Sequence, residues 1–126
     1  MPQPTLAIEH HAIVEALQRY VDGATGTNSA IMRPSFDDRA TVYSIDGDGA
    51  IAGGPADVAL FDPVDNALPP SPDAQSATIH IDVVRTAASA RVDTDGLAGA
   101  NYTDFFHLLK VHGEWKIVSK VFHAYD

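Results

Sequence analysis

The chain has 126 residues, a length typical of one domain, and its 17 acidic residues outnumber 8 basic ones to give a formal charge of −9. This balance disfavours nucleic acid and anionic membranes as partners. Cysteine is absent, which excludes a disulfide framework, a thiolate metal site and a cysteine nucleophile. The sequence has no run of about 18 apolar residues and no secretion signal, so we expect a cytoplasmic protein without a membrane span.

The chain begins with two predicted helices. Apolar residues recur at spacings of three and four between Thr5 and Asp22, which predicts an amphipathic helix with Thr5 as its N-cap and Gly23 as its end. A second set of capping residues follows at 27–29 and predicts a helix of only a few turns before Pro34.

The middle of the chain alternates between strands, turns and one more helix. A β-branched run predicts a strand over 39–45, and the Asp-Gly pairs at 46–49 predict a turn. A brief strand at 50–52 precedes a third helix at 55–61. Four prolines predict an irregular loop over 62–73.

The second half is predicted to be four strands, at 77–84, 86–93, 101–111 and 114–123. The last two are joined by a tight turn at His112 and Gly113. On the second of these strands we expect Arg91 to form a salt bridge with Asp82 of the first. Helices followed by a strand meander predict an α+β domain spanning residues 1–126, with three helices packed on one face of a curved antiparallel sheet.

The two faces of this sheet are expected to differ in role. The face toward the helices can enclose a pocket. Strict alternation places Phe105 and Phe122 on the opposite face, where apolar side chains not covered by helices predict a homodimer through the sheet. The alternative is that the proline-rich loop covers this face.

Three stretches resemble the nuclear transport factor two-like superfamily: QRYV at 18–21, DDRATV at 37–42 and DFFHLLKVHGEWKI at 104–117. The resemblance covers most of the chain, and its ending is most similar to the SnoaL-like and putative lumazine-binding groups. It implies a cone-shaped, cystatin-like sheet (an α+β barrel), a hydrophobic pocket and usually a homodimer. Members include isomerases, cyclases, epoxide hydrolases, dehydratases and non-catalytic binders, so the fold assigns no activity.

Ketosteroid isomerase, a member of that superfamily, allows a comparison residue by residue. Tyr20 matches its tyrosine in the first helix, and Asp104 matches its protonated aspartic acid on the penultimate long strand. Its general base lies two positions after an Ala-Thr-Val run, where this sequence has Ser44. Asp46 would replace that base only if the strand were displaced, so the resemblance does not carry over proton abstraction by this route.

The penultimate strand supplies the first group of candidate site residues. Alternation places Tyr102, Asp104 and Phe106 on one face. A carboxyl group among aromatic rings would have a raised pKa, remain protonated and donate a hydrogen bond to a substrate oxygen. Tyr20 would be the second donor. Alternatively, Asp104 accepts backbone hydrogens and the Tyr20 hydroxyl is satisfied locally.

The last strand supplies the second group. Counted by alternation, Trp115, Ser119 and His123 share one face, so Ser119 and His123 would be polar points on an apolar wall. His123 could transfer protons near neutral pH, or it could be half exposed and idle. No histidine spacing or glycine-rich motif indicates a metal or a cofactor.

These residues support one leading function and two alternatives. We expect a binding protein for an apolar, oxygen-bearing small molecule, with Tyr20, Tyr102, Phe106, Trp115 and Ser119 as ligand contacts. The alternative is an enzyme, an isomerase, cyclase or dehydratase acting on a carbonyl or hydroxyl substrate, with Asp104 and His123 as acid or base. The second alternative is a structural dimer whose pocket is filled by its own side chains.

Overall fold

The computed structural model describes residues 6–125. In chain order these residues form α1 (Leu6–Thr25), α2 (Ser29–Met32), a 3-10 turn (Arg33–Ser35), β1 (Phe36–Ile45), β2 (Ile51–Pro55), a π-helical turn (Asp57–Phe61), α3 (Asp62–Asn66), β3 (Gln75–Val84), β4 (Ala87–Leu97), β5 (Ala100–Val111) and β6 (Glu114–Tyr125). The predicted order of helices and strands is confirmed, and the predicted N-cap Thr5 lies outside the described residues.

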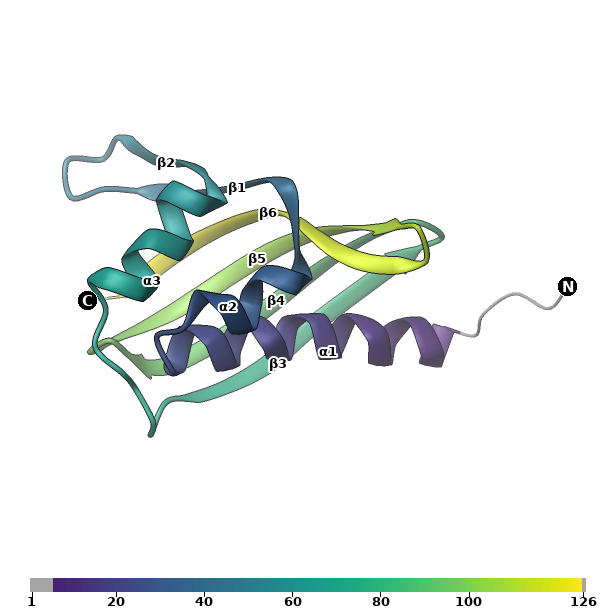
Figure 1. Ribbon diagram of the computed structural model, residues 1–126, viewed down its shortest axis with the longest axis horizontal. Helices are drawn as coiled ribbons and strands as arrows, with labels where there is room; N and C mark the ends of the chain where they lie inside the picture. The colour runs from purple at the N-terminus through teal and green to yellow at the C-terminus, as the bar shows by residue number, and fades with distance from the viewer. Residues whose placement is uncertain (1–5, 126) are drawn as a thin grey trace, which may run out of the picture.

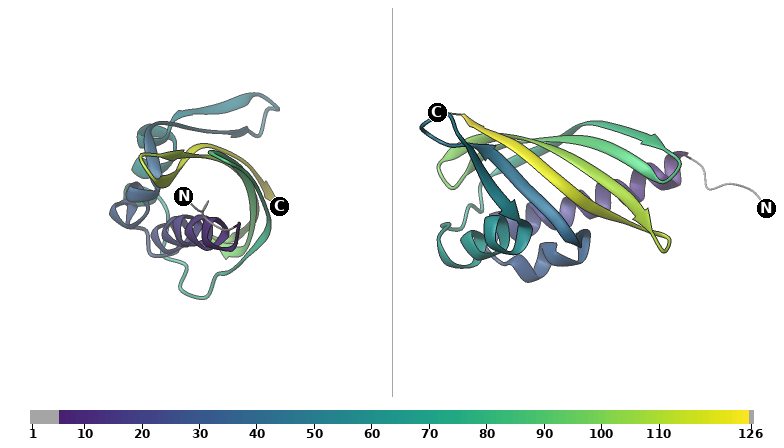
Figure 2. Two further views of the ribbon diagram at one scale, coloured as in Figure 1. Left: turned by 90° about the vertical axis from the view of Figure 1, so that its right-hand side faces the viewer. Right: turned by 90° about the horizontal axis from the view of Figure 1, so that it is seen from above.

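The six strands form one sheet in the order β2-β1-β6-β5-β4-β3, so β2 and β3 are its edges. Neighbouring strands are antiparallel except that β1 runs parallel to β6. The long strands curl around α1, which lies lengthwise in the concave face (Figure 1; Figure 2, left). The predicted α+β class with a curved sheet is therefore confirmed, and the sheet remains open at its two edges.

The apolar stripe of α1 explains this packing. Ile13, Leu17, Tyr20 and Ala24 recur at spacings of three and four and are all buried, because this spacing places them on one side of a helix. The prediction that the helix ends at Gly23 is wrong, because α1 continues to Thr25. A side chain at that position would press against α2, so the glycine allows the two helices to approach closely.

The segment predicted as an irregular loop contains a helix. Residues 57–61 form a wide helical turn that runs directly into α3, and Pro63 lies in the first turn of α3, where a missing N–H costs least. Asp65 joins this segment to α2, because its carboxylate accepts hydrogen bonds from the Ser29 backbone N–H (2.8 Å) and hydroxyl (2.6 Å). These hydrogen bonds hold the pKa of Asp65 below its ordinary value.

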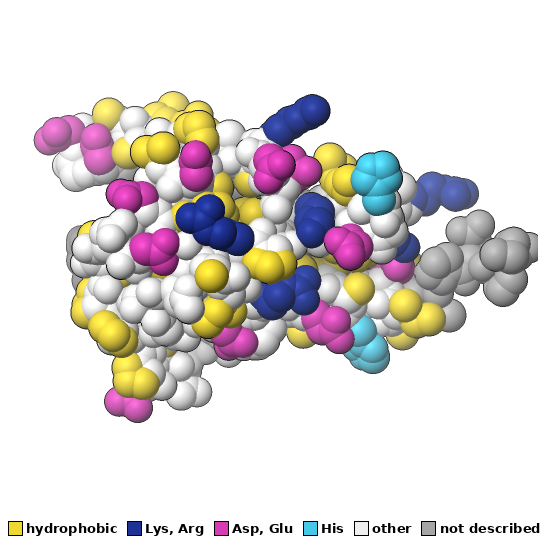
Figure 3. Space-filling view, viewed as in Figure 1, with side chains coloured by type: hydrophobic (Ala, Val, Ile, Leu, Met, Phe, Trp, Pro, Cys, Tyr) yellow, Lys and Arg dark blue, Asp and Glu magenta, His cyan; other side chains and the backbone are white. Residues whose placement is uncertain are grey.

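The core lies between α1 and the concave face of the sheet. Val92, Phe106, Leu108 and Ile117 point inward from three neighbouring strands and are buried. Phe106 packs edge-on against Tyr20, with ring centroids 5.2 Å apart. The helical face of the molecule carries acidic and basic side chains intermingled with apolar ones (Figure 3). No helix among residues 6–125 is long and apolar enough to cross a membrane.

Candidate functional site

A cavity of about 160 Å³ lies between the C-terminal half of α1, the helical segment 57–66 and the concave face of the sheet. Its walls are mostly apolar, with Ala24, Leu60, Val64 and Leu97 among them. The polar atoms belong to a few side chains that meet the cavity from the helix and the sheet: Tyr20, Tyr102 and Lys120. An apolar hollow with a few converging polar groups is the usual form of a small-molecule site.

Two of these lining residues, Tyr20 and Lys120, form a buried cluster with Asp104. The Tyr20 hydroxyl donates a hydrogen bond to Asp104 Oδ2 at 3.1 Å. Lys120 Nζ lies 3.7 Å from Asp104 Oδ1, which is an ion pair beyond hydrogen-bond distance. Asp104 Oδ1 is buried and accepts no hydrogen bond from the described residues. The carboxylate is therefore only half satisfied, and one of its oxygens faces the lysine.

Burial dominates the electrostatics of this cluster. Removal from water raises the pKa of Asp104 above its ordinary value, although the Lys120 charge and the Tyr20 hydrogen bond oppose that shift. The same burial lowers the pKa of Lys120, against the opposing attraction of Asp104. Burial, followed by the Asp104 charge, raises the pKa of Tyr20. These shifts bring the pKa values of the Asp104 carboxyl and the Lys120 amine closer together than in water, so a proton passes between the two groups more easily than between exposed ones.

Aromatic rings enclose the lysine. Its Nζ atom lies 4.2 Å from the centroid of the Phe122 ring and 5.0 Å from that of Tyr20. Ring faces attract a cation, most strongly where water is excluded. The Lys120 side chain is only 5% exposed, so these rings and Asp104 together replace the water that an ammonium group ordinarily keeps.

A bulge in β6 explains why the sequence pattern missed Lys120. Leu108 of β5 pairs with Ile117, but the preceding His107 pairs with Ser119, so Val118 is an extra residue in β6. Side chains alternate along a strand, and one extra residue therefore reverses every face beyond it. The bulge turns Lys120 inward, although strict alternation from Trp115 placed it on the outer face.

The bulge also corrects three predicted positions. Ser119 and His123 were expected in the hollow, but they lie on the outer, convex face, where Ser119 pairs with Thr41 and His107. His123 is exposed and its ring packs edge-on against Tyr125. Conversely Phe122, expected on the outer face, lines the cavity. The prediction of His123 as an acid or base in the hollow is therefore wrong.

The remaining predicted residues divide between the cavity and the core. Tyr102 lines the cavity. Asp104 does not line it but contacts two residues that do, Tyr20 and Lys120. Phe106 is fully buried beneath Tyr20. Trp115 is buried beside a separate hollow of about 380 Å³ near the start of β6, and its indole N–H has no partner among the described residues. Trp115 therefore does not belong to the cavity that contains the charged cluster.

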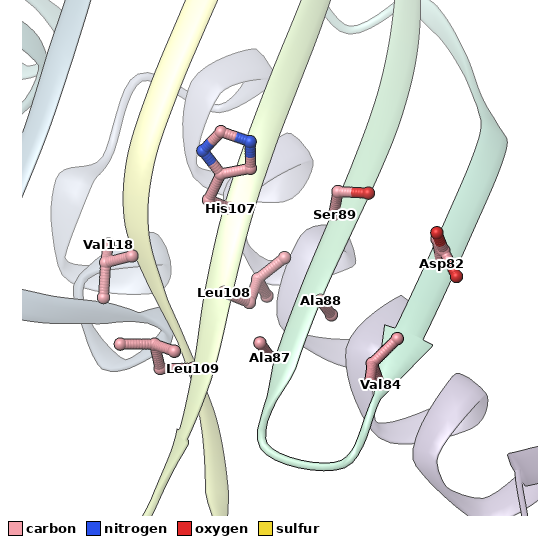
Figure 4. Close-up of a pocket in the computed structure, with 9 residues that line it drawn as sticks. All are labelled: Asp82, Val84, Ala87, Ala88, Ser89, His107, Leu108, Leu109 and Val118. Carbon is pink, nitrogen blue, oxygen red and sulfur yellow. The ribbon is translucent and has the colours of Figure 1, made fainter.

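The outer face has a polar group and a shallow hollow of its own. Arg91 pairs with Asp93 at 3.0 Å rather than with the predicted Asp82, because Asp93 lies two residues along the same strand face. The hollow, of about 330 Å³, contains Asp82, Ser89 and His107 on three different strands (Figure 4). Their side chains stand apart over the sheet surface. No group of three acidic or histidine side chains that could hold a metal occurs within residues 6–125.

Comparison with known proteins shows a family whose sequences resemble this chain along most of its length. The sequence pattern of the family described as "Putative lumazine-binding" matches residues 8–123. The protein named aldolase FrzH from Cladobotryum sp is 31% identical over 121 residues, which cover 93% of this chain and 92% of that protein.

Two solved structures are also closely similar. A protein of unknown function from Shewanella baltica OS155, described as NTF2-like, is 48% identical with a TM-score of 0.96, over 98% of this chain and 99% of that one. Another from Methylobacillus flagellatus KT is 32% identical with a TM-score of 0.88, over 98% and 97% of the two chains. These likenesses agree with the predicted superfamily.

Proposed function

We propose that this chain, which belongs to the putative lumazine-binding family, binds a small organic carbonyl compound in the cavity between α1, α3 and the sheet. The observation that carries the proposal is the cavity itself, an apolar hollow whose charged group is the half-satisfied Asp104–Lys120 pair. A ligand there would lie against apolar walls and direct its oxygen toward the lysine.

The available hydrogen-bond donors support an oxygen acceptor as the ligand's polar end. The Tyr20 hydroxyl already donates to Asp104, so it offers a ligand only its lone pairs. Lys120, in contrast, lines the cavity, and an ammonium group carries three N–H donors. A carbonyl oxygen matches such a donor, and the apolar remainder of a ketone or aldehyde matches the walls.

The size of the cavity supports a small ligand. At about 160 Å³ the cavity is smaller than the roughly 300–1,000 Å³ of pockets that hold drug-sized ligands. The segment that closes the cavity is joined to α2 through Asp65 and Ser29, and the Ser71 N–H donates to the Thr25 carbonyl at 2.8 Å. These contacts join the cavity wall to α2 and to the end of α1.

Binding can be tested by NMR titration with small ketones and with hydrocarbons of the same shape. Ketones should perturb residues around the cavity, and their affinity should exceed that of the hydrocarbons by roughly tenfold to a hundredfold, the value of a hydrogen bond to a charged group. Lys120→Met should remove this preference. Ser119→Ala, on the outer face, is the matched control and should leave it unchanged. Equal affinity for ketones and hydrocarbons would contradict the proposal.

A second candidate function is catalysis on the bound carbonyl, of the aldol type. A carboxyl group and an amine 3.7 Å apart beside an apolar cavity can hold and return a proton during such a reaction. The 31% identical relative is named an aldolase, which supports this reaction class over the isomerase, cyclase and dehydratase alternatives. Turnover of a panel of β-hydroxy ketones tests it: cleavage by the wild type that is lost in Asp104→Asn supports catalysis, and absence of cleavage supports binding alone.

We also propose that the chain forms a homodimer through its outer sheet face. Phe105 of β5 is 51% exposed, and its neighbour across the ladder, Val121, is 47% exposed. Leu109 and Tyr43 add further exposed apolar area to the same face. Apolar patches of this kind commonly mark contacts between proteins. Dimerisation would cover them and leave the cavity, on the other side of the sheet, free for a ligand.

A further inference from the structure

We infer that Lys120 forms a covalent imine with the carbonyl carbon of a ketone or aldehyde bound in the cavity. The inference rests on the proposed function and deepens it, since it specifies how the carbonyl is held. It assigns Lys120 as a nucleophile, a role that requires an amine which lines the cavity, is free of strong hydrogen bonds and has a proton acceptor nearby.

The three lysines of the chain differ sharply in these respects. Lys110 donates to both carboxylate oxygens of Glu9, at 2.9 and 3.1 Å. Lys116 donates to the Pro34 carbonyl oxygen at 2.6 Å and forms an ion pair with Glu114. Lys120 alone lines the cavity, and its nearest acidic partner is Asp104 at 3.7 Å. The Lys120 amine, which a bound carbonyl would contact, is therefore also the lysine amine with the weakest polar contacts.

Asp104 is placed to accept the proton that the amine must lose. Only a neutral amine attacks a carbonyl, and the cluster holds one proton to be shared between Lys120 and Asp104. The groups facing the lysine are the Tyr20 and Phe122 rings and the Asp104 carboxylate, so the local cationic group is Lys120 itself. Burial shifts the pKa of both partners toward a neutral amine and a neutral acid, which supports this assignment.

The reaction balances with the groups present. The Lys120 amine attacks the carbonyl carbon, the C–N bond forms, and the amine proton passes to the former carbonyl oxygen to give a carbinolamine. Asp104 then donates its proton to that hydroxyl, the C–O bond breaks, and water leaves. The product is a protonated imine beside a carboxylate. Because ring faces attract cations, Tyr20 and Phe122 would stabilise its positive charge.

Reductive trapping of the full-length protein tests the inference. The protein is incubated with cyclopentanone and cyanoborohydride, which reduces an imine to a stable secondary amine. We expect a single adduct whose mass is that of the ketone less one oxygen atom, and peptide mapping should locate it on Lys120. This readout uses the wild type, so it does not depend on a variant that fails to fold.

Matched variants separate the three lysines. Lys120→Arg retains the positive charge without a nucleophilic amine and should lose the adduct, whereas Lys116→Arg should retain it. Adducts spread equally over Lys110, Lys116 and Lys120 would overturn the inference. A ketone that binds in the NMR titration but leaves no adduct would overturn the imine and leave the proposed function intact. Absence of both binding and adduct would reject the two together.

Discussion

Removing either charge of the buried Asp104–Lys120 pair is expected to destabilise the protein far more than removing both. At 3.7 Å and an effective dielectric constant of about 20, the attraction between the two charges is roughly 4–5 kcal/mol. Loss of one partner also leaves an uncompensated charge at a site where both side chains are 5% exposed or less. We therefore expect Lys120→Met alone, or Asp104→Asn alone, to lower the free energy of unfolding by about 3–5 kcal/mol.

The double variant should recover most of that loss, because it leaves no charge to desolvate. Asp104→Asn keeps an oxygen that accepts the Tyr20 hydrogen bond, so the comparison isolates charge. At roughly 2.1 cal/mol/K per residue, unfolding of 126 residues has an entropy near 0.26 kcal/mol/K, and about 1 kcal/mol shifts Tm by about 4 °C. Each single variant should therefore unfold roughly 11–19 °C below the wild type.

The same pair predicts a pH dependence. Because the pKa of Asp104 is raised above 3.8 on folding, its contribution to stability is complete below that pH and is lost as pH rises through the raised value. Because the pKa of Lys120 is lowered below 10.5, its contribution is complete above that pH and is lost as pH falls through the lowered value. The stability of the wild type relative to the double variant should thus be smallest between these two transitions.

Calorimetry of the four proteins across this pH range checks both expectations. A cycle in which the two single-variant effects simply add would show that the two groups do not interact as a charged pair. A relative stability that does not change with pH would refute the assigned pKa shifts. Either result would remove the electrostatic basis of the proposed site.

Three further outcomes are expected. Tyr20→Phe removes the hydrogen-bond donor to Asp104 and should lower the free energy of unfolding by about 1–3 kcal/mol. It should also raise the pKa of Asp104 further, which an NMR titration of the carboxyl carbon would report. An unchanged pKa would contradict the assigned hydrogen bond. Gly53→Ala should destabilise by roughly 3 kcal/mol in denaturant titrations, because φ is +138° and a β-carbon would collide with strand β1, whereas Gly47→Ala, in open space, should be neutral. Phe105→Glu should convert the expected dimer to a folded monomer in light scattering; a wild type already monomeric would reject the proposed interface.

Much of the architecture follows from local patterns in the sequence. The stripe of α1 and the strand periods of β3 to β6 require only 3.6-residue and 2-residue spacings, and these local repeats predicted the α+β class. The alternation of β5 likewise places Tyr102, Asp104 and Phe106 on the concave side, and the structure brings Tyr20 of α1 into contact with Asp104. Their roles as ligand contacts remain predictions.

The orientation of β6 could not be obtained in this way. Its alternation changes at Val118 because β5 and β6 pair with one extra residue between Leu108 and His107, and a bulge depends on which partner residues face each other across the ladder. The sequence of β6 alone contains no clear sign of it. Strict alternation therefore assigned Ser119 and His123 to the concave face and Lys120 and Phe122 to the outer face, which is the reverse of the observed arrangement.

The sequence by itself determined the acidic charge, the helix and strand periods, and the side of β5 that carries Asp104, because each depends on composition or on neighbours a few residues apart. Only the tertiary structure decided that Lys120 faces Asp104, and that the helical segment 57–66 closes a cavity over them. Those positions depend on strand register and on packing between segments distant in the chain, and interactions between distant segments form only when the whole chain folds.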